Sequence, residues 1–203
     1  MAQQILNIGS AANDGTGDAL RDSMIKIGDN FDELYDNLQK LTETIGWGVY
    51  SDSVVSNQTI TATPSKLTIN SLNANTNENY LPKEIRGVSS LWDSVNNKIT
   101  PINVGDSYDF RVDLTIDSKS GSPTILDFTL DIGGGASPTI IAISRAIGLY
   151  KTPPYSLSIG FPIYSLATFV ANGGQIFLSV DTGSIDISSR IVFIKRDTNG
   201  NIW

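Results

Sequence analysis

The feature that most constrains how this chain folds is an unbroken stripe of apolar residues near its N-terminus. Its members recur at alternating intervals of four and three residues, which is the 3.5-residue period of a coiled coil. A surface helix packed on its own domain, the alternative interpretation, usually has a broader apolar face. We therefore predict a parallel coiled coil over residues 18–46. The stripe, which we call the seam, consists of Leu20, Met24, Ile27, Phe31, Leu34, Leu38, Leu41 and Ile45.

Other residues of this segment bear on where the helix starts and how stable it is. Asp18 is the expected N-cap, because its carboxylate can accept hydrogen bonds from the free N–H groups of the first turn. Gly15 and Gly17 let the chain turn sharply before it. Gly28 weakens the helix by about 1 kcal/mol relative to alanine, and a lone helix of this length is marginal. Association should therefore stabilise it, and the Met, Phe, Leu and Ile at the a positions favour three strands over two.

The same segment contains a recognisable motif. It consists of Asn7-Ile8-Gly9, Ala12-Asn13-Asp14-Gly15-Thr16-Gly17-Asp18, Leu20-Arg21, Lys26-Ile27, Asn30-Phe31 and Glu33-Leu34-Tyr35. This set resembles the N-terminal segment of many tailed-bacteriophage virion fibre proteins. The resemblance implies that residues 1–17 attach the protein to the virion, that the helix forms a homotrimer, and that a separate distal domain follows. Gly28 departs from the pattern, where a residue such as Asn is expected.

The anchoring segment, residues 1–17, is expected to bind capsid, neck or tail proteins of the phage. Ile5 and Ile8 would supply apolar contacts, and Asp14 would meet a basic rim on the partner. The segment is acidic and Gly-rich and precedes any strand-forming sequence, which favours it as the attachment point. As a binding peptide it is expected to order on docking. The predicted anchor residues are Ile5, Ile8, Asn13, Asp14, Gly15 and Gly17.

The composition of the chain limits the size of its core and the kinds of partner it can have. With 203 residues, 40% of them apolar, the chain can bury one sizeable core. Charged residues make up only 17%, which suggests that much surface is buried between subunits. A net charge of −7 without clustered Lys and Arg argues against a nucleic-acid partner. Because no apolar run reaches about 18 residues, we expect no membrane insertion and no cleaved signal. The protein would be made in the host cytoplasm and assembled into the virion.

Alternating apolar and polar residues predict strands after residue 46. Residues 108–116 and 126–132 show the clearest alternation, and the turn at 118–123 predicts that they form a hairpin. The predicted inward side chains are Phe110, Val112, Leu114, Phe128 and Leu130, and the predicted outward ones are Asp109, Arg111, Asp127 and Thr129.

Further strands are expected at 49–55, 59–62, 66–69, 139–144, 157–164, 175–180, 185–187 and 191–195, with no helix after Ile45. So many short strands predict that residues 47–203 form an antiparallel β-sandwich. The runs Leu91-Trp92-Asp93, Asn97-Lys98-Ile99, Gly105-Asp106-Ser107-Tyr108 and Phe169-Val170-Ala171-Asn172-Gly173-Gly174 resemble the distal domain of certain phage fibres. This second resemblance implies a trimeric jelly roll similar to tumour necrosis factor.

Residues suited to catalysis or metal binding are scarce. Without His or Cys, the usual Ser-His-Asp and Cys-His arrangements and thiolate or imidazole metal sites cannot form. Residues 181–184 and 197–201 have the oxygen-rich composition of calcium loops, but they are most simply turns. A carboxylate pair could serve a glycosidase, yet the strand carboxylates alternate with core residues, as a solvated face requires. These carboxylates are Asp109, Asp113, Asp127 and Asp131. We expect no catalytic residue, cofactor or metal.

These observations together predict a non-enzymatic virion protein. The expected molecule is a homotrimeric short fibre or decoration protein on the capsid or neck, whose β-sandwich head adheres to a host-surface glycan or protein. A receptor-binding tail fibre tip is the first alternative. A polysaccharide-degrading tailspike is the second, and the short chain argues against it.

Overall fold

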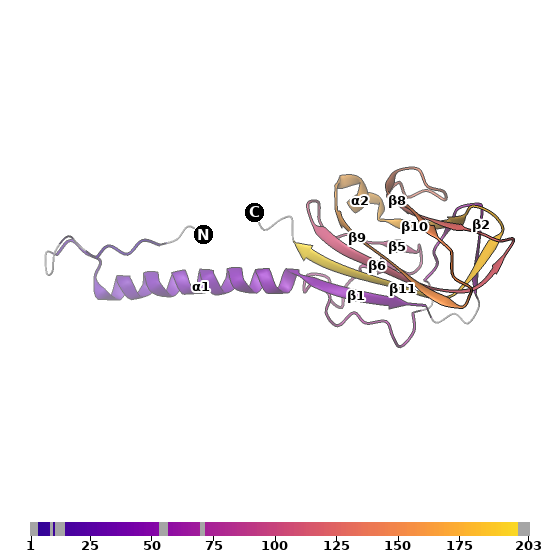
Figure 1. Cartoon of the computed structure of the whole chain (residues 1–203). Coiled ribbons are helices and arrows are strands. Elements are labelled where there is room, and N and C mark those ends of the chain that lie inside the picture. Colours follow the sequence, from indigo (N-terminus) through magenta and orange to yellow (C-terminus); the bar gives the residue numbers. More distant parts are fainter. Residues whose placement is uncertain (1–3, 9, 11–14, 53–56, 70–71, 199–203) are drawn as a thin grey trace. The chain divides into compact units, whose positions relative to one another are not determined.

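The computed structural model describes residues 4–8, 10, 15–52, 57–69 and 72–198. The chain divides into two compact units, Met1–Glu43 and Thr44–Trp203. We call the first the N-terminal unit and the second the head. Figure 1 shows that helix α1 (Leu20–Thr44) is the main element of the N-terminal unit and that the strands gather in the head.

Helix α1 has 25 residues and begins two residues after Asp18. It ends before Ile45, so the last residue of the predicted seam lies outside the helix. The helix stops there because strand β1 (Gly46–Ser51) pairs with β11 (Ser184–Thr198), starting with Gly46 opposite Arg196. Arg196 also donates a hydrogen bond from Nη1 to the carbonyl oxygen of Thr44, at 3.1 Å. This bond satisfies one of the carbonyl groups that a helix end leaves without an intrahelical partner.

The strands of the head form two antiparallel sheets and one small hairpin. Besides β1 and β11, they are β2 (Gln58–Thr61), β3 (Ser65–Lys66), β4 (Trp92–Asp93), β5 (Lys98–Ile99), β6 (Ser107–Ser120), β7 (Ile125–Asp131), β8 (Ile141–Gly148), β9 (Tyr155–Tyr164) and β10 (Gln175–Val180). The first sheet has the order β1-β11-β6-β9, and β2 pairs with the first part of β11. The second sheet has the order β3-β10-β7-β8, and β4 pairs with β5.

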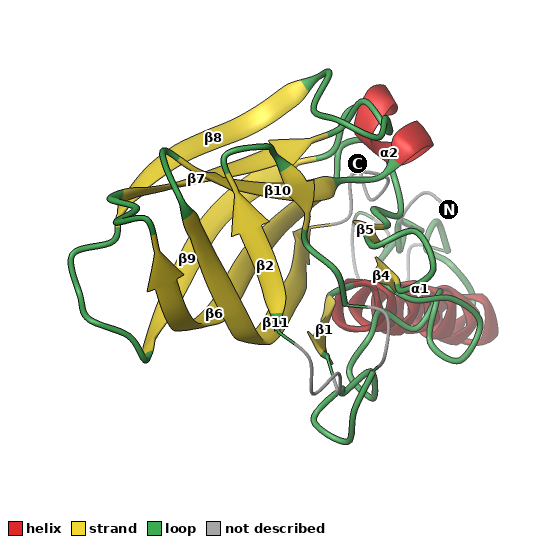
Figure 2. Ribbon diagram, turned by 90° about the vertical axis from the view of Figure 1, so that its right-hand side faces the viewer, coloured by secondary structure: helices red, strands yellow, loops and turns green. Residues whose placement is uncertain are grey.

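The two sheets pack face to face, as Figure 2 shows. The chain crosses from one sheet to the other between β2 and β3, and again between β3 and β6 by way of the β4–β5 hairpin. It also crosses between β6 and β7, β8 and β9, β9 and β10, and β10 and β11. This nested order is that of a jelly roll, in which long connections place strands distant in sequence side by side. The predicted antiparallel β-sandwich is confirmed.

The core lies between the sheets and contains all five predicted inward residues, each at most 3% exposed. The Phe161 ring of β9 lies 5.5 Å from the Phe110 ring and 5.4 Å from the Phe128 ring between centroids. Phe110 and Phe161 are neighbours within the first sheet, and the contact of Phe161 with Phe128 joins the two layers. Asp109 and Arg111 are exposed, while Asp127 and Thr129 are half-buried on the opposite face of β7. The predicted register of both strands is therefore confirmed.

The predicted hairpin between these two strands is wrong. β6 pairs with β11 and β9, whereas β7 pairs with β10 and β8 in the other sheet. The turn around Gly121 carries the chain across the sandwich, so that the apolar faces of β6 and β7 meet each other through the core. Alternation determines which face of a strand is buried, but it does not specify the neighbouring strand.

The prediction that Asp131 lies on a solvated strand face is also wrong, because its side chain is fully buried. Its Oδ1 atom accepts hydrogen bonds from the backbone N–H groups of Thr139 (2.7 Å) and Ile140 (2.6 Å), and Oδ2 accepts one from Gly133 (3.1 Å). Three N–H donors compensate for the burial of a carboxylate. Asp131 thereby fixes the glycine-rich loop between β7 and β8.

Other differences from the sequence prediction are local. Helix α2 (Ala167–Asn172) lies where no helix was expected, because six residues are too few to show a helical period. β11 is one long strand and not two, since irregular register near Ile187 and Ser189 interrupts its alternation. β3 is shorter than predicted, although Leu67 and Ile69 just after it are fully buried.

A buried ionic cluster lies at the end of the head where β1 begins. The Arg196 and Asp106 side chains are both 0% exposed, and Arg196 Nη2 lies 2.8 Å from Asp106 Oδ1. Arg196 also pairs with Glu84, and the Tyr108 hydroxyl donates to Asp106 Oδ2 at 2.9 Å. Burial is the main cause that raises the pKa of Tyr108. Such a cluster is stable only while every charge keeps its partner.

Candidate functional site

The N-terminal segment runs back along α1 and is tied to it by hydrogen bonds. Gln4 and Asn30 form a reciprocal pair: Gln4 N donates to Asn30 Oδ1 (2.8 Å), and Asn30 Nδ2 donates to Gln4 O (2.9 Å). One turn closer to the helix start, Lys26 Nζ donates to the carbonyl oxygen of Ile5 at 3.3 Å. We call residues 4–8, held in this way, the strap.

At the other end of the strap, Asp18 binds Asn7. Its Oδ2 atom accepts hydrogen bonds from Asn7 N (3.0 Å) and Lys26 Nζ (2.6 Å), and its own N–H donates to Asn7 O (2.8 Å). Lys26, and after it the Asn7 N–H, hold the pKa of this carboxyl below its ordinary value. Asp18 was predicted to cap the helix, but its carboxylate instead ties the strap and Lys26 together.

The strap is the functional feature that sequence reasoning missed. Its ties use Asn7, Asp18, Lys26 and Asn30, four residues of the motif that resembles phage fibre proteins. Their shared membership of that motif was the available signal. Spacing alone could not find the strap, because Gln4 and Asn30 are 26 residues apart in sequence.

The seam is exposed in the single chain. Leu20, Met24, Phe31, Leu34 and Leu38 are between 54% and 81% exposed, and Ile27 is half-buried. Leu41 lies within α1, but its side chain is outside the described part of the structure. Ile45 is 43% exposed and follows the helix.

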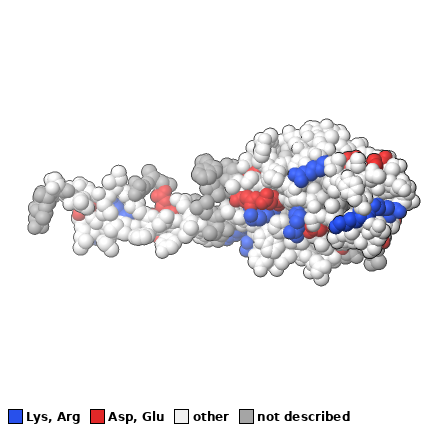
Figure 3. All heavy atoms as spheres, in the orientation of Figure 1, with Lys and Arg blue, Asp and Glu red and all other residues white. Residues whose placement is uncertain are grey.

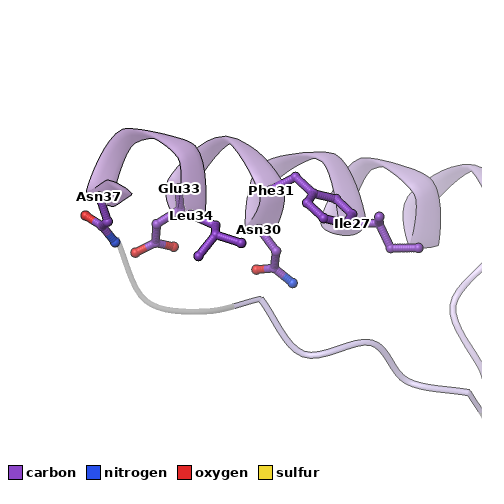
Figure 4. Close-up of a pocket in the computed structure, with 6 residues that line it drawn as sticks. All are labelled: Ile27, Asn30, Phe31, Glu33, Leu34 and Asn37. Carbon is purple, nitrogen blue, oxygen red and sulfur yellow. The ribbon is translucent and has the colours of Figure 1, made fainter. Parts of the chain in front are cut away.

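The middle of the seam lines an open groove of about 450 Å³ on α1. Figure 4 shows its six lining side chains, which are Ile27, Asn30, Phe31, Glu33, Leu34 and Asn37. Three of them, Ile27, Phe31 and Leu34, are consecutive seam residues. The strap is bonded to Lys26 and Asn30, which are not seam residues, although Asn30 also lines this groove.

The structure describes four of the six predicted anchor residues. Ile5 and Ile8 are 82% and 90% exposed, so the strap presents two apolar side chains to solvent. Gly15 has a φ of +70°, in the left-handed region that favours glycine, and Gly17 is exposed in the same turn. Asn13 and Asp14 lie outside the described residues.

The expected turns near the C-terminus have structural roles. Asp181 accepts hydrogen bonds from the Thr124 N–H (2.9 Å), the Thr124 hydroxyl (2.5 Å) and the Ile125 N–H (3.1 Å), and it joins the start of β7 to the end of β10. These bonds, led by that of the Thr124 hydroxyl, lower the pKa of Asp181 to about 2. The expected turn at 197–201 is wrong for its first two residues, because Asp197 and Thr198 end strand β11. Asp197 pairs with Lys195, and residues 199–201 are outside the described part. Within the described residues, no cluster of acidic side chains forms a metal site.

Comparison with known proteins identifies the family. A family model described as bacteriophage T4 gp9/10-like protein, N-terminal, matches residues 3–125. This chain belongs to that family. Membership confirms the resemblance to bacteriophage virion proteins. The match extends beyond the motif, from the strap and α1 through β6 to the first residue of β7.

One curated relative is the baseplate wedge protein gp10 of Enterobacteria phage T4, 48% identical over 63 residues. The match covers 30% of this chain but only 10% of that protein. Among solved structures, the chain is similar to Eiger TNF from S. frugiperda, with a TM-score of 0.47 and 7% identity over 77% of this chain and 94% of that one. It is also similar to PRD1 vertex protein P5, with a TM-score of 0.44 and 9% identity over 75% and 73%. No helix in the described residues is long and apolar enough to span a membrane.

Proposed function

We propose that the protein is a non-enzymatic, homotrimeric short fibre or decoration protein of a bacteriophage virion. Residues 1–17 anchor it, α1 forms a parallel three-stranded coiled coil, and the head is displayed for adhesion or binding to a host-surface glycan or protein. The observation that carries this proposal is the seam, whose apolar side chains are exposed in the single chain. Contiguous exposed apolar surface marks an interaction site, and the heptad spacing fits a copy of the same helix.

The strap supports anchoring by the N-terminus. Its hydrogen bonds to α1 and Asp18 hold residues 4–8 in place in the single chain, so this part of the segment does not need docking to order, contrary to the expectation from the sequence. A preordered segment loses less conformational entropy on binding, and this strengthens its attachment. Ile5 and Ile8 are its most exposed apolar side chains, and we propose that they enter apolar sites on the neighbouring virion protein.

We propose that the protein sits on the capsid or neck of the particle. The modest reach of one helix and one head favours the capsid or neck, as the sequence predicts. The baseplate is a second candidate, because the matched relative is a baseplate wedge protein. A receptor-binding tail fibre tip would use the same anchor and coiled coil with a different neighbour.

A non-enzymatic head is consistent with the roles of its strand carboxylates. Asp131 is buried among three backbone N–H groups, and Asp113 accepts hydrogen bonds from Arg111 (2.9 Å) and from the Ser158 hydroxyl (2.6 Å). These contacts give the two carboxylates structural roles. Release of reducing sugar from host glycan by the purified protein would instead support the tailspike alternative.

Incorporation into particles tests the anchor. Deleting residues 2–17 should leave a trimer that no longer joins virions, since α1 and the head are intact. Ile5→Asp with Ile8→Asp should have the same effect, because two charges replace exposed apolar contacts. Ile25→Asp is the matched control: Ile25 is 54% exposed but lies outside both the seam and the anchor. Particles that still carry the deleted chain would contradict the anchor assignment.

Labelling particles with an antibody against the head locates the protein. Signal around the capsid or neck is the result expected from the sequence. Signal at the baseplate would support the second candidate and exclude the capsid and neck.

A further inference from the structure

The side of the head formed by β8 and β9 is an open edge of both sheets. β8 pairs only with β7, and β9 pairs only with β6, in the described part of the chain. The opposite side differs, because residues 72–81 cover β1. There, Val49 and Asn77 exchange backbone hydrogen bonds of 3.0 and 2.9 Å, and Trp47 N donates to Tyr80 O at 2.8 Å. One side of the sandwich is thus closed by the chain itself, and the other is left open.

The open side is almost free of charge. The chain has 14 Lys and Arg and 21 Asp and Glu residues, yet residues 132–180 contain only Arg145 and Lys151. β9 and α2 have no charged residue, and β8 has only Arg145. Arg145 Nη1 donates to the carbonyl oxygen of Gly160 at 3.1 Å, so this side chain bridges the edges of the two sheets. In Figure 3, charged side chains form a band across the middle of the head, while the upper surface, where Figure 1 places α2, is mostly uncharged.

Apolar groups fill this uncharged side. A groove of about 520 Å³ lies between the end of β9, β8 and α2, and Ile143, Ile163 and Phe169 are among its lining residues. Two further lining residues, Tyr164 and Leu166, are 67% and 57% exposed, and Ile141, the first residue of β8, is also 57% exposed. Natural proteins usually protect exposed sheet edges with charges. An apolar edge without them is a surface that another chain covers.

We propose that the β8–β9 edge and its groove form the interface between heads, with a second and third copy of this chain as the occupants. In a closed trimer, side chains that face the threefold axis meet their own copies. Any charge there, of either sign, faces like charges and is repelled. A different partner could carry the complementary charge, so it would not require an uncharged surface. The scarcity of both signs over this edge therefore favours self-association. Arg145 is the one charged residue of β8 and β9, and its guanidinium is bound to the Gly160 carbonyl oxygen.

This inference rests on the proposed homotrimer and names the part of the head that assembles. The uncharged edge contributes to the low charge of the whole chain, because residues 132–180 hold only 2 of its 35 charged residues. Asp109 and Arg111 on the exposed face of β6 lie outside this edge.

Site-specific cross-linking tests the interface in the full chain. The protein has no cysteine, so Ser144→Cys adds one thiol on exposed β8, and Val95→Cys adds one at a residue that is 86% exposed outside this region. With a short bis-maleimide reagent at low protein concentration, we expect cross-linked chains from Ser144→Cys and none from Val95→Cys. Adding Ile141→Asp to Ser144→Cys should abolish the cross-link, whereas Val88→Asp should leave it unchanged.

The outcomes separate this inference from the proposed function. Circular dichroism of each variant verifies that the head is folded. If the wild-type chain is a trimer by mass but Ser144→Cys gives no cross-link, the head interface is wrong while the coiled coil stands. Equal cross-linking from Val95→Cys would also overturn it. A monomeric wild-type chain would contradict the trimer itself, and with it this inference.

Discussion

The two units of this protein bury their apolar residues in opposite ways. In α1, five seam side chains are at least 54% exposed, whereas the core residues of the head are at most 4% exposed. Both patterns were visible in the sequence as regular alternation, with a period of 3.5 in the helix and 2 in the strands. The difference teaches that periodicity shows which face is apolar, and that only the fold shows whether the same chain covers that face.

The consequence is a difference in what each unit needs in order to be stable. The head buries its apolar faces between its own two sheets, so a single chain provides both sides of the core. The N-terminal unit has only one helix and the strap, and an isolated helix of this length is marginal in water. Its stability should therefore depend on concentration more strongly than that of the head, whose core is complete within one chain.

The largest expected effect comes from charging the seam. Leu34→Asp with Leu38→Asp places carboxylates where the proposed coiled coil excludes water, so we expect loss of the oligomer in light scattering and loss of helix in circular dichroism. The head should keep its near-ultraviolet signal. Ile25→Asp, outside the seam at similar exposure, should leave the oligomer intact. An unchanged oligomer in the double variant would show that the heads assemble without the helix.

The second-largest expected effect comes from breaking the buried ionic cluster of the head. Arg196→Met should cost about 3 to 5 kcal/mol in the free energy of unfolding, because it leaves the buried Asp106 without its cation. Arg111→Met is the control: Arg111 pairs with Asp113 at the surface, and such pairs contribute about 0 to 1 kcal/mol. Denaturant titration with the core tryptophan and tyrosine signals measures both. Equal losses in the two variants would contradict the assigned burial.

A smaller, stabilising change is expected from Gly28→Ala. A Cβ atom at this position would meet nothing within 4 Å in the single chain, and alanine favours a helix over glycine by about 1 kcal/mol. Thermal melting of the helix signal should shift upward, with no change in melting of the head. A downward shift would mean that a neighbouring copy packs closely against Gly28.

The smallest effect is confined to the strap and depends on pH. Because the folded-state pKa of Asp18 lies below its ordinary value of 3.8, its contribution is present above that value and is lost as the pH falls through the folded-state pKa. Hydrogen exchange of the Asn7 amide should then speed up on acidification. Asp18→Asn should show fast exchange already at neutral pH, while core amides of β6 stay protected. Slow exchange in that variant would contradict the role of the carboxylate.

Particular residues show how far the sequence could lead. The alternation of Phe110, Val112 and Leu114 determined the buried face of β6, because side chains alternate strictly along a strand. It could not reveal that β6 pairs with β11, since residues about 80 positions apart come together only through the order of the jelly roll.

In the candidate site, too, one feature could be predicted from the sequence and another could not. The seam was readable because its contacts are made at fixed intervals on one helix. The strap was not, because Asp18 carries the ordinary signal of an N-cap, and a carboxylate at a helix start can bind a lysine and a distant N–H as well as the first turn. The burial of Asp131 was equally hidden, since its partners Gly133, Thr139 and Ile140 form an irregular loop.

The central claim is that the exposed seam is covered by two further copies of this chain. The most direct test is the mass of the full-length protein in solution, measured by light scattering over a range of concentrations, beside the variant with Leu34→Asp and Leu38→Asp. The account predicts three times the 21.9 kDa of one chain for the wild type and a smaller species for the variant. A wild-type chain that remains at 21.9 kDa at every concentration would contradict it.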